Sequence, residues 1–320
     1  MVTTDPSLVE PHARADAPWA ERAPGRMALA RDLVTLTKPR ITAIVLATCA
    51  AGIAMAPAHM SWPRAVAALL GTSLIVASAN ALNMWWERDL DRLMVRTARR
   101  PLPAGRLAPE VALGFGLLLA LVSLPLLLSV NLVTTLLGVL ALVVYVAVYT
   151  PLKRHSTLAL LVGAVPGAMP PLMGWTSATG AIAGGGVPGL TEAARLGGVW
   201  LFGLLFIWQV PHFIAISFFR AKDYAAAGLK VVPVERGERV AKWQILGYTL
   251  LLVATSLGLC GLSGGAYLIS ALGLGALFVG FGMYGLRPAS GARWARSLFA
   301  FSIVYLIAIL AILIVDRTPV

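Results

Sequence analysis

The feature that most constrains this chain is a series of long apolar segments, each of about twenty residues. A helix of that length spans a hydrocarbon core ~30 Å thick. The segments do not alternate between polar and apolar residues, so they do not fit a membrane β-barrel. They predict an all-α polytopic membrane protein with about nine transmembrane helices. The segments are residues 41–57, 65–86, 109–129, 131–150, 157–175, 197–219, 243–262, 266–286 and 294–315.

The composition excludes an ordinary soluble domain, and the placement of charge indicates an orientation. Charged residues make up 12% of the chain, against roughly 25% in soluble domains. With a cytoplasmic N-terminus, all but three of the 26 Lys and Arg residues fall in cytoplasmic segments; the exceptions are Arg64, Arg195 and Arg317. This asymmetry follows the positive-inside rule. It accounts for the net charge of +12 without nucleic-acid binding, and it predicts a multi-pass protein of a bacterial inner (cytoplasmic) membrane.

The N-terminal region differs in composition from the rest of the chain. Residues 1–30 have neither the apolar core of a signal peptide nor the acid-poor composition of an organellar transit sequence. We expect a disordered cytoplasmic tail there, followed by a single transmembrane domain over residues 31–320. Cys49 and Cys260 both lie in predicted spans without a metal-binding spacing, so we expect them to pack as small apolar residues.

The long loops indicate which face carries the chemistry. Two basic loops, residues 87–108 and 220–242, lie on the predicted cytoplasmic side. The opposite side has one long loop, the glycine-rich segment 176–196, and otherwise short turns. We therefore expect the site on the cytoplasmic face. Within one span, the stretch PGAMPP (166–171) predicts a broken or widened helix, which serves either packing or a cavity wall.

Asn83, Glu87 and Asp91 close the second apolar segment at four-residue spacing. Residues four apart lie on one face of an α-helix, so this face would carry an amide and two carboxylates. Oxygen ligands of this kind suit Mg²⁺ that holds a polyphosphate, and six arginines follow within the loop 87–108. The spacing fits equally well with acids that pair with arginines at the headgroup surface.

Other charged residues flank the spans on the same side. Asp223 follows the sixth span and is either a second metal position or a solvated loop residue. Lys153 and Arg154 follow the fourth span, and phosphate is often bound by Lys as a point charge and by Arg as a fork. Lys38 and Arg40 precede the first span, where they either bind phosphate or anchor the helix end.

His212 lies inside a predicted span, in the sequence WQVPHF. Ionisable residues within a membrane are candidates for function, and neutral histidine ligates iron or carries protons. A histidine that bonds a backbone carbonyl freed by Pro211 is the structural alternative.

Four ordered blocks between Leu36 and Val315 resemble the UbiA-type intramembrane prenyltransferases. The Asn-x₃-acid-x₃-Asp face is shared across that superfamily. The RT-x-x-RPLPAGR, PGA-x-PP-x-x-GW and PHF…KDY…AG…PV patterns are similar to the branch that farnesylates protohaem IX. The blocks are LTKPR (36–40), NMWWERDLDRLMVRTARRPLPAGR (83–106), YTPLKRHSTLALLVGAVPGAMPPLMGW (149–175) and WQVPHFIAISFFRAKDYAAAGLKVVPVERGE (208–238).

The resemblance implies a helical bundle around a central lipid-open cavity and a reaction between two membrane-associated substrates. These are farnesyl diphosphate and haem B, with haem O and diphosphate as products and Mg²⁺ as the cofactor. Haem A synthase and terminal oxidase assembly factors are the partners it suggests. The residue roles that it implies are a metal–diphosphate face from Asn83, Glu87 and Asp91, with Asp223 as a further metal position; diphosphate binding by Lys153, Arg96, Arg100, Lys38 and Arg154; and haem binding by His212.

Two departures and two alternatives accompany this interpretation. Glu87 stands where the superfamily usually has Asp, and Asp223 stands alone where many members place two aspartates. The nearest alternative is a related enzyme for another acceptor, such as an aromatic acid, a quinone precursor or a chlorophyllide. A transporter of haem or an anionic lipid would also use broken helices, but it would place charges near the midplane, whereas these acids lie at one face.

Overall fold

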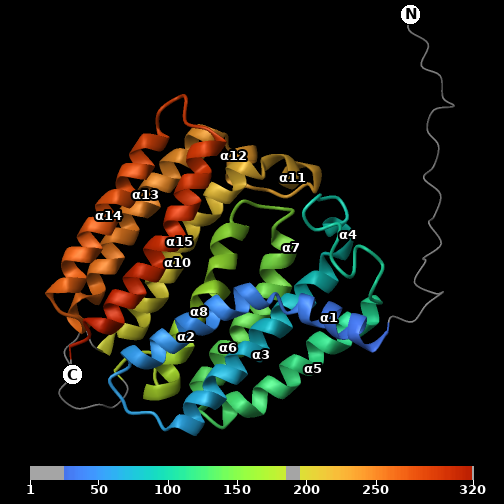
Figure 1. The fold of residues 1–320 in the computed structure, drawn as a ribbon, viewed down its shortest axis with the longest axis horizontal. Helices are drawn as coiled ribbons and strands as arrows, with labels where there is room; N and C mark the ends of the chain where they lie inside the picture. Colours follow the sequence, from blue (N-terminus) through green and yellow to red (C-terminus); the bar gives the residue numbers. More distant parts are fainter. Residues whose placement is uncertain (1–24, 185–194, 319–320) are drawn as a thin grey trace, which may run out of the picture.

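The computed structural model describes residues 25–184 and 195–318, and this part of the chain folds into helices without a β-sheet (Figure 1). The predicted all-α architecture is therefore confirmed. Most of the predicted tail, residues 1–24, and much of the glycine-rich loop lie outside the described residues. Helix α1 (Arg26–Leu36) begins before the predicted domain boundary at residue 31, so the last residues assigned to a disordered tail are helical.

Every one of the nine apolar segments forms a helix. Among the described residues, seven helices are long and apolar enough to cross a membrane, and α1 with α2 forms one further bent candidate with a 48° break. Helix α8 is in neither group, so the count of nine spans stays a prediction. The long helices are α2 (Pro39–Met55), α3 (Trp62–Trp86), α5 (Pro109–Leu128), α6 (Leu132–Val143), α8 (Ala159–Thr179), α10 (Gly197–Phe219), α13 (Glu238–Leu257), α14 (Gly265–Gly285) and α15 (Ala292–Val315).

Short helical segments connect these long ones. Helices α4, α11 and α12 lie at one end of the bundle, where the two basic loops emerge (Figure 1). A π-helix extends α6, and a 3₁₀-helix extends α13. These segments are α4 (Arg88–Asp91), α7 (Thr150–Leu152), α11 (Ala221–Ala226), α12 (Val232–Glu235), the π-helix η3 (Val144–Tyr149) and the 3₁₀-helix η4 (Gly258–Leu262).

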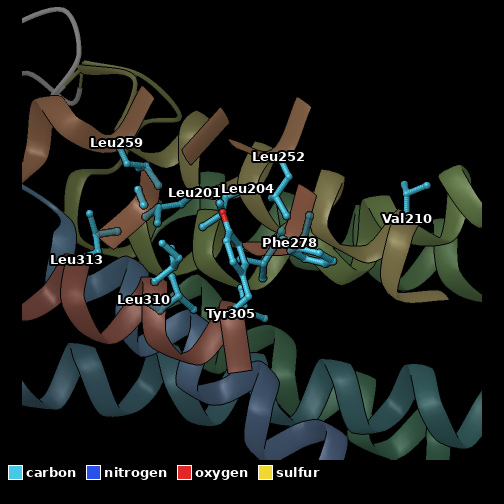
Figure 2. Close-up of a cluster of buried hydrophobic side chains, with 14 of the residues drawn as sticks. Leu201, Leu204, Val210, Leu252, Leu259, Phe278, Tyr305, Leu310 and Leu313 are labelled. Atoms are coloured by element: carbon cyan, nitrogen blue, oxygen red, sulfur yellow. The ribbon is translucent and has the colours of Figure 1, made fainter. Parts of the chain in front are cut away.

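Helix α8 joins the two halves of the bundle, because it packs against α2 and α6 on one side and α10 on the other. The larger core lies among α10, α13, α14 and α15, where Leu204, Phe278 and Tyr305 are fully buried (Figure 2). In lipid, such contacts depend on close packing rather than on exclusion of water. This core packs helices α10, α13, α14 and α15 against one another, and α10 packs against α8.

Glycines allow α2 and α8 to approach each other closely. A Cβ at Gly52 would lie 2.0 Å from the carbonyl oxygen of Pro171, and one at Gly174 would lie 2.0 Å from that of Cys49. Small residues at membrane helix contacts permit this backbone approach. The prediction of a broken helix at 166–171 is wrong, because α8 runs from Ala159 to Thr179 with its prolines inside the helix. A kink for packing, the structural form of that prediction, stays a prediction.

Candidate active site

The end of α3 and the short helix α4 carry the three residues that the sequence placed on one face. Helical backbone bonds cross the junction, from Glu87 N–H to Asn83 O at 2.9 Å and from Asp91 N–H to Glu87 O at 2.8 Å. The side chains therefore stay in helical register, as the spacing predicted. All three are buried, with relative exposures of 2% for Asn83, 8% for Glu87 and 1% for Asp91.

Each buried carboxylate of this face is paired with a cation from another part of the chain. Lys153 Nζ lies 2.7 Å from Glu87 Oε1 and 3.0 Å from Oε2. Arg100 donates a hydrogen bond of 2.7 Å to Asp91 Oδ2. A buried carboxylate without such a partner would be strongly destabilising. The pairs therefore offset the cost of placing two carboxylates inside the protein.

Asp89 behaves differently from its two neighbours. Its side chain is 70% exposed and lies near the guanidinium groups of Arg88 and Arg92. The surface pairing that the sequence left open as an alternative therefore describes Asp89, whereas Glu87 and Asp91 face the interior.

Asn83 and the two ion pairs form a cluster of charged and polar side chains. Lys38, which lies at the break between α1 and α2, adds a third cation to this cluster. Its Nζ donates to Asn83 Oδ1 at 3.3 Å. Its backbone has φ 48°, the left-handed region that costs a non-glycine residue free energy and often occurs at functional sites. Hydrogen bonds to the carbonyl of Thr37, from the Thr42 hydroxyl and the Asn80 amide, hold this conformation.

The second basic loop meets the first one beside Lys153. Lys230 N–H donates to the backbone oxygen of Lys153 at 2.8 Å. Met94 of the first loop packs against Ala227 and Leu229 of the second, with Tyr224 beside them. Burial raises the pKa of Tyr224, while neighbouring cations oppose this shift. Segments that are far apart in sequence thus form one surface at this end of the bundle.

Asp223 lies on this surface but is not gathered with the other acids. Its carboxylate lies 3.6 Å from the guanidinium of Arg220, and its side chain is 20% exposed. Among the described residues, no three His, Cys, Asp or Glu side chains are grouped closely enough to hold a metal ion. The metal role of Glu87, Asp91 and Asp223 therefore stays a prediction. Of the predicted phosphate ligands, Arg96 and Arg154 are exposed at the same end of the bundle.

The chemistry of the residues at the end of α3 nevertheless fits a hard divalent cation. Mg²⁺ prefers one or two carboxylates, with further oxygens from water and phosphate. Glu87 and Asp91 supply two buried carboxylates, and Asn83 adds a carbonyl oxygen that already faces a cation, Lys38. The donor set thus suits Mg²⁺.

His212 lies in α10, among aromatic residues. Its ring stacks on Trp208 with a centroid distance of 4.5 Å, and Phe299 lies on it at 4.6 Å. Its Nδ1 is 2.7 Å from Ser302 Oγ. The alternative that His212 bonds a carbonyl freed by Pro211 is wrong, because its partner is a side chain of α15.

Sequence reasoning did not identify two buried residues at this end of the bundle: Thr150, which contacts Asn83, and Asp32, which binds the first basic loop. Thr150 accepts a hydrogen bond from Asn83 Nδ2 at 3.0 Å. Asp32 of α1 binds the guanidinium of Arg106 at 3.1 to 3.3 Å, which attaches α1 to the first basic loop. The sequence around Asp32 and Thr150 gives little indication of these contacts, because the partner of each residue lies far away in the chain.

A helical membrane bundle with paired acids and cations buried at one end is the architecture of an intramembrane prenyltransferase. The UbiA prenyltransferase family model matches residues 45–304. The chain belongs to this family, and the resemblance seen in its motifs is confirmed.

Relatives within the family have a more specific name. The chain is 46% identical to the protoheme IX farnesyltransferase of Myxococcus xanthus over 93% of its own length and 98% of that protein. It is 52% identical to the protoheme IX farnesyltransferase of Sorangium cellulosum over 78% of its length and 85% of that protein.

Solved structures share the fold at low sequence identity. A digeranylgeranylglyceryl phosphate synthase superposes with a TM-score of 0.74 at 16% identity, covering 91% of this chain and 98% of that one. A UbiA homologue from Archaeoglobus fulgidus, solved with GPP and Mg²⁺, superposes with a TM-score of 0.58 at 15% identity, covering 88% and 99%.

Proposed function

We propose that this chain transfers the farnesyl group of farnesyl diphosphate to a vinyl group of haem B, with addition of water, giving haem O and diphosphate. Relatives at 46% and 52% identity named protoheme IX farnesyltransferase support this activity. The bond between farnesyl C1 and the diphosphate oxygen breaks, and its electron pair leaves with diphosphate. A vinyl carbon bonds to C1, water adds to the other vinyl carbon, and one proton is released.

The observation that carries the proposal is the arrangement of charge at the end of α3. Two buried carboxylates, Glu87 and Asp91, lie among three cations, Lys38, Arg100 and Lys153. Such a cluster can bind an anion together with a divalent cation. The carboxylates would then coordinate the metal, and the cations would bind the phosphates. Preorganised charges of this kind stabilise a leaving group where water is excluded.

Glu87 and Asp91, with the oxygen of Asn83, are the residues that would hold Mg²⁺, and Asp223 is a further candidate from the second loop. When bound, Mg²⁺ would neutralise negative charge on the diphosphate. The Archaeoglobus fulgidus homologue with the same fold was solved with GPP and Mg²⁺. That precedent supports the cofactor for this chain.

The cations of the chain bind and stabilise the departing diphosphate. Lys153 already approaches the site from a helix end, and Arg100 reaches it from the loop. Arg96 and Arg154 are exposed nearby and steer the anion toward the cluster. The farnesyl chain lies among the apolar helices, where burial contributes ~0.8 kcal/mol per CH₂ relative to water.

His212 is proposed to bind or orient the haem iron. Ser302 donates its only hydroxyl hydrogen to Phe299 O at 2.6 Å, so its oxygen must accept from His212 Nδ1–H. That tautomer leaves a lone pair on Nε2, which is the form that ligates iron.

The cellular setting is part of the same proposal. The protein spans an inner (cytoplasmic) membrane, and its basic loops lie on the cytoplasmic side, in keeping with the positive-inside rule. A product that stays in the membrane is passed to a haem A synthase or a terminal oxidase assembly factor.

The direct test uses purified protein in lipid nanodiscs with haem B, farnesyl diphosphate and Mg²⁺, followed by mass spectrometry. The expected result is a haem adduct with the mass of an added farnesyl group and a hydroxyl group, absent when EDTA replaces Mg²⁺. A parallel reaction offers 4-hydroxybenzoate as the acceptor. Prenylation of that acid, with haem B unchanged, would overturn the haem assignment, and no transfer to either would overturn the activity.

A further inference from the structure

The fourth apolar segment changes from an α-helix to a π-helix over Val144–Tyr149, directly before Thr150. π-Helical turns are rare and frequently lie at functional sites. Here the Thr150 backbone N–H donates to Tyr145 O, five residues back. The extra residue in the turn changes the phase of the helix that follows. No residue of the π-helix is buried, whereas Thr150 is 1% exposed, so the turn is followed by an inward-facing hydroxyl.

The hydrogen bonds of Thr150 determine the orientation of the Asn83 side chain. The Thr150 hydroxyl donates its single hydrogen to Tyr145 O at 2.8 Å. Toward Asn83 the oxygen can therefore only accept, and the group 3.0 Å away must be the amide nitrogen. The second Nδ2 hydrogen goes to Glu87 Oε2 at 2.9 Å. With both hydrogens engaged, the amide oxygen is left to face Lys38.

We propose that Thr150 is a positioning residue, which holds the Asn83 amide with its oxygen toward the cation and diphosphate site. This inference rests on the proposed function only for the identity of the ligand, a prenyl diphosphate with a divalent cation. Of the three partners of Asn83, Glu87 and Lys38 are charged and are the groups that such a ligand would engage. Thr150 is neutral and tied to the backbone, so it keeps the amide oriented when the charged partners turn to the ligand.

The first test measures ligand binding without catalysis. Isothermal titration with farnesyl thiodiphosphate, an unreactive analogue, and Mg²⁺ compares the wild type with Thr150→Val and Thr150→Ser. Valine keeps the shape and removes the hydroxyl, whereas serine keeps the hydroxyl. We expect Thr150→Val to bind roughly tenfold more weakly and Thr150→Ser to bind like the wild type. Equal affinity in all three would overturn the proposal.

The second test separates positioning from simple support of the helix. If Thr150 acts through Asn83, the double variant Thr150→Val/Asn83→Ala should bind no worse than Asn83→Ala alone. The same four proteins are also compared by thermal unfolding without ligand. This comparison remains possible if Asn83→Ala binds the analogue too weakly to measure. Losses that add in these measurements would mean that Thr150 acts through Tyr145 O and the π-helix, against the proposal.

The failure of this inference is distinguishable from failure of the proposed function. A wild-type protein that binds the analogue in a Thr150-dependent manner, but leaves haem B unmodified, would retain the positioning role and lose only the acceptor. A wild-type protein that does not bind the analogue with Mg²⁺ would contradict both. Circular dichroism and gel filtration of each variant confirm that the fold is intact.

Discussion

Lys153 and Glu87, 66 residues apart in the chain, form a part-buried ion pair at 2.7 Å that joins the end of the fourth apolar segment to the end of the second. The Lys153 ammonium also lies 4.3 Å from the centre of the Tyr149 ring. The pair links the same two helix ends as the hydrogen bond from Asn83 to Thr150, and it brings a cation and an acid to one point.

The Lys153–Glu87 pair predicts different behaviour for stability and for turnover. Lys153→Met leaves a buried carboxylate without its cation, which should lower the free energy of unfolding by ~3–5 kcal/mol. The double variant Lys153→Met/Glu87→Gln removes both charges and should regain most of that loss, while turnover stays very low. Thermal unfolding and a farnesyl transfer assay measure the two effects. Recovered turnover in the double variant would show that the pair is only structural.

The bond between Asp32 and Arg106 predicts that α1 restrains the first basic loop. Asp32→Asn weakens a hydrogen-bonded ion pair, and bonds to charged groups contribute about 1.5–3 kcal/mol. Because Arg106 also donates to Arg99 O at 3.2 Å, we expect faster amide exchange in residues 92–108. Hydrogen–deuterium exchange measures this, with the exposed Asp89→Asn as the matched control. Unchanged exchange in Asp32→Asn would contradict the restraint.

The close approach of α2 and α8 predicts that Gly174 tolerates no side chain. Gly174→Ala would place a carbon 2.0 Å from Cys49 O, so the helices must separate, and overpacking of this kind costs ~1–3 kcal/mol or more. Gly273→Ala on α14 is the control, because nothing lies within 4 Å of the point where its Cβ would stand. Thermal unfolding in detergent should show a clear loss only for Gly174→Ala. Equal stability of the two variants would argue against tight packing here.

The proposed binding of haem by His212 predicts that its replacement affects haem selectively. His212→Ala should weaken haem B binding by roughly tenfold or more and leave farnesyl thiodiphosphate binding unchanged, because the diphosphate cluster lies at the end of α3. The control is His155→Ala, since His155 is exposed beside Arg154. Absorbance titration with haem B measures the affinity. Unchanged haem affinity and turnover in His212→Ala would remove His212 from the site.

The sequence predicted those features that depend on local spacing. Apolar length located the helices, and four-residue spacing placed Asn83, Glu87 and Asp91 on one buried face. The features that it missed depend on tertiary contacts. The proline-rich stretch of α8 was expected to break the helix, but the glycine contacts with α2 accompany a continuous one.

The pairing of side chains that are far apart in the chain also could not be predicted from the sequence. No local pattern shows that Lys153 bonds Glu87 or that Thr150 meets Asn83, since each pair joins residues on separate helices. The only local sequence feature beside the π-helix is Pro151, and a proline after a helix does not distinguish a π-helix from an α-helix. For Asp223, the sequence left open a second metal position or a solvated loop residue. Its loop does meet the first loop, but its carboxylate pairs with Arg220, so its metal role still rests on resemblance.

The most direct measurement of where the reaction takes place is the rate of farnesyl transfer to haem B by Asp91→Asn beside Asp89→Asn. The two acids are two residues apart, yet Asp91 is 1% exposed and bound to Arg100, whereas the Asp89 side chain is 70% exposed. Removing a charge that stabilises the reacting groups costs roughly 10²-fold or more in turnover. We expect such a loss for Asp91→Asn and near-normal turnover for Asp89→Asn. Near-normal turnover in Asp91→Asn would contradict the placement of the site at the end of α3.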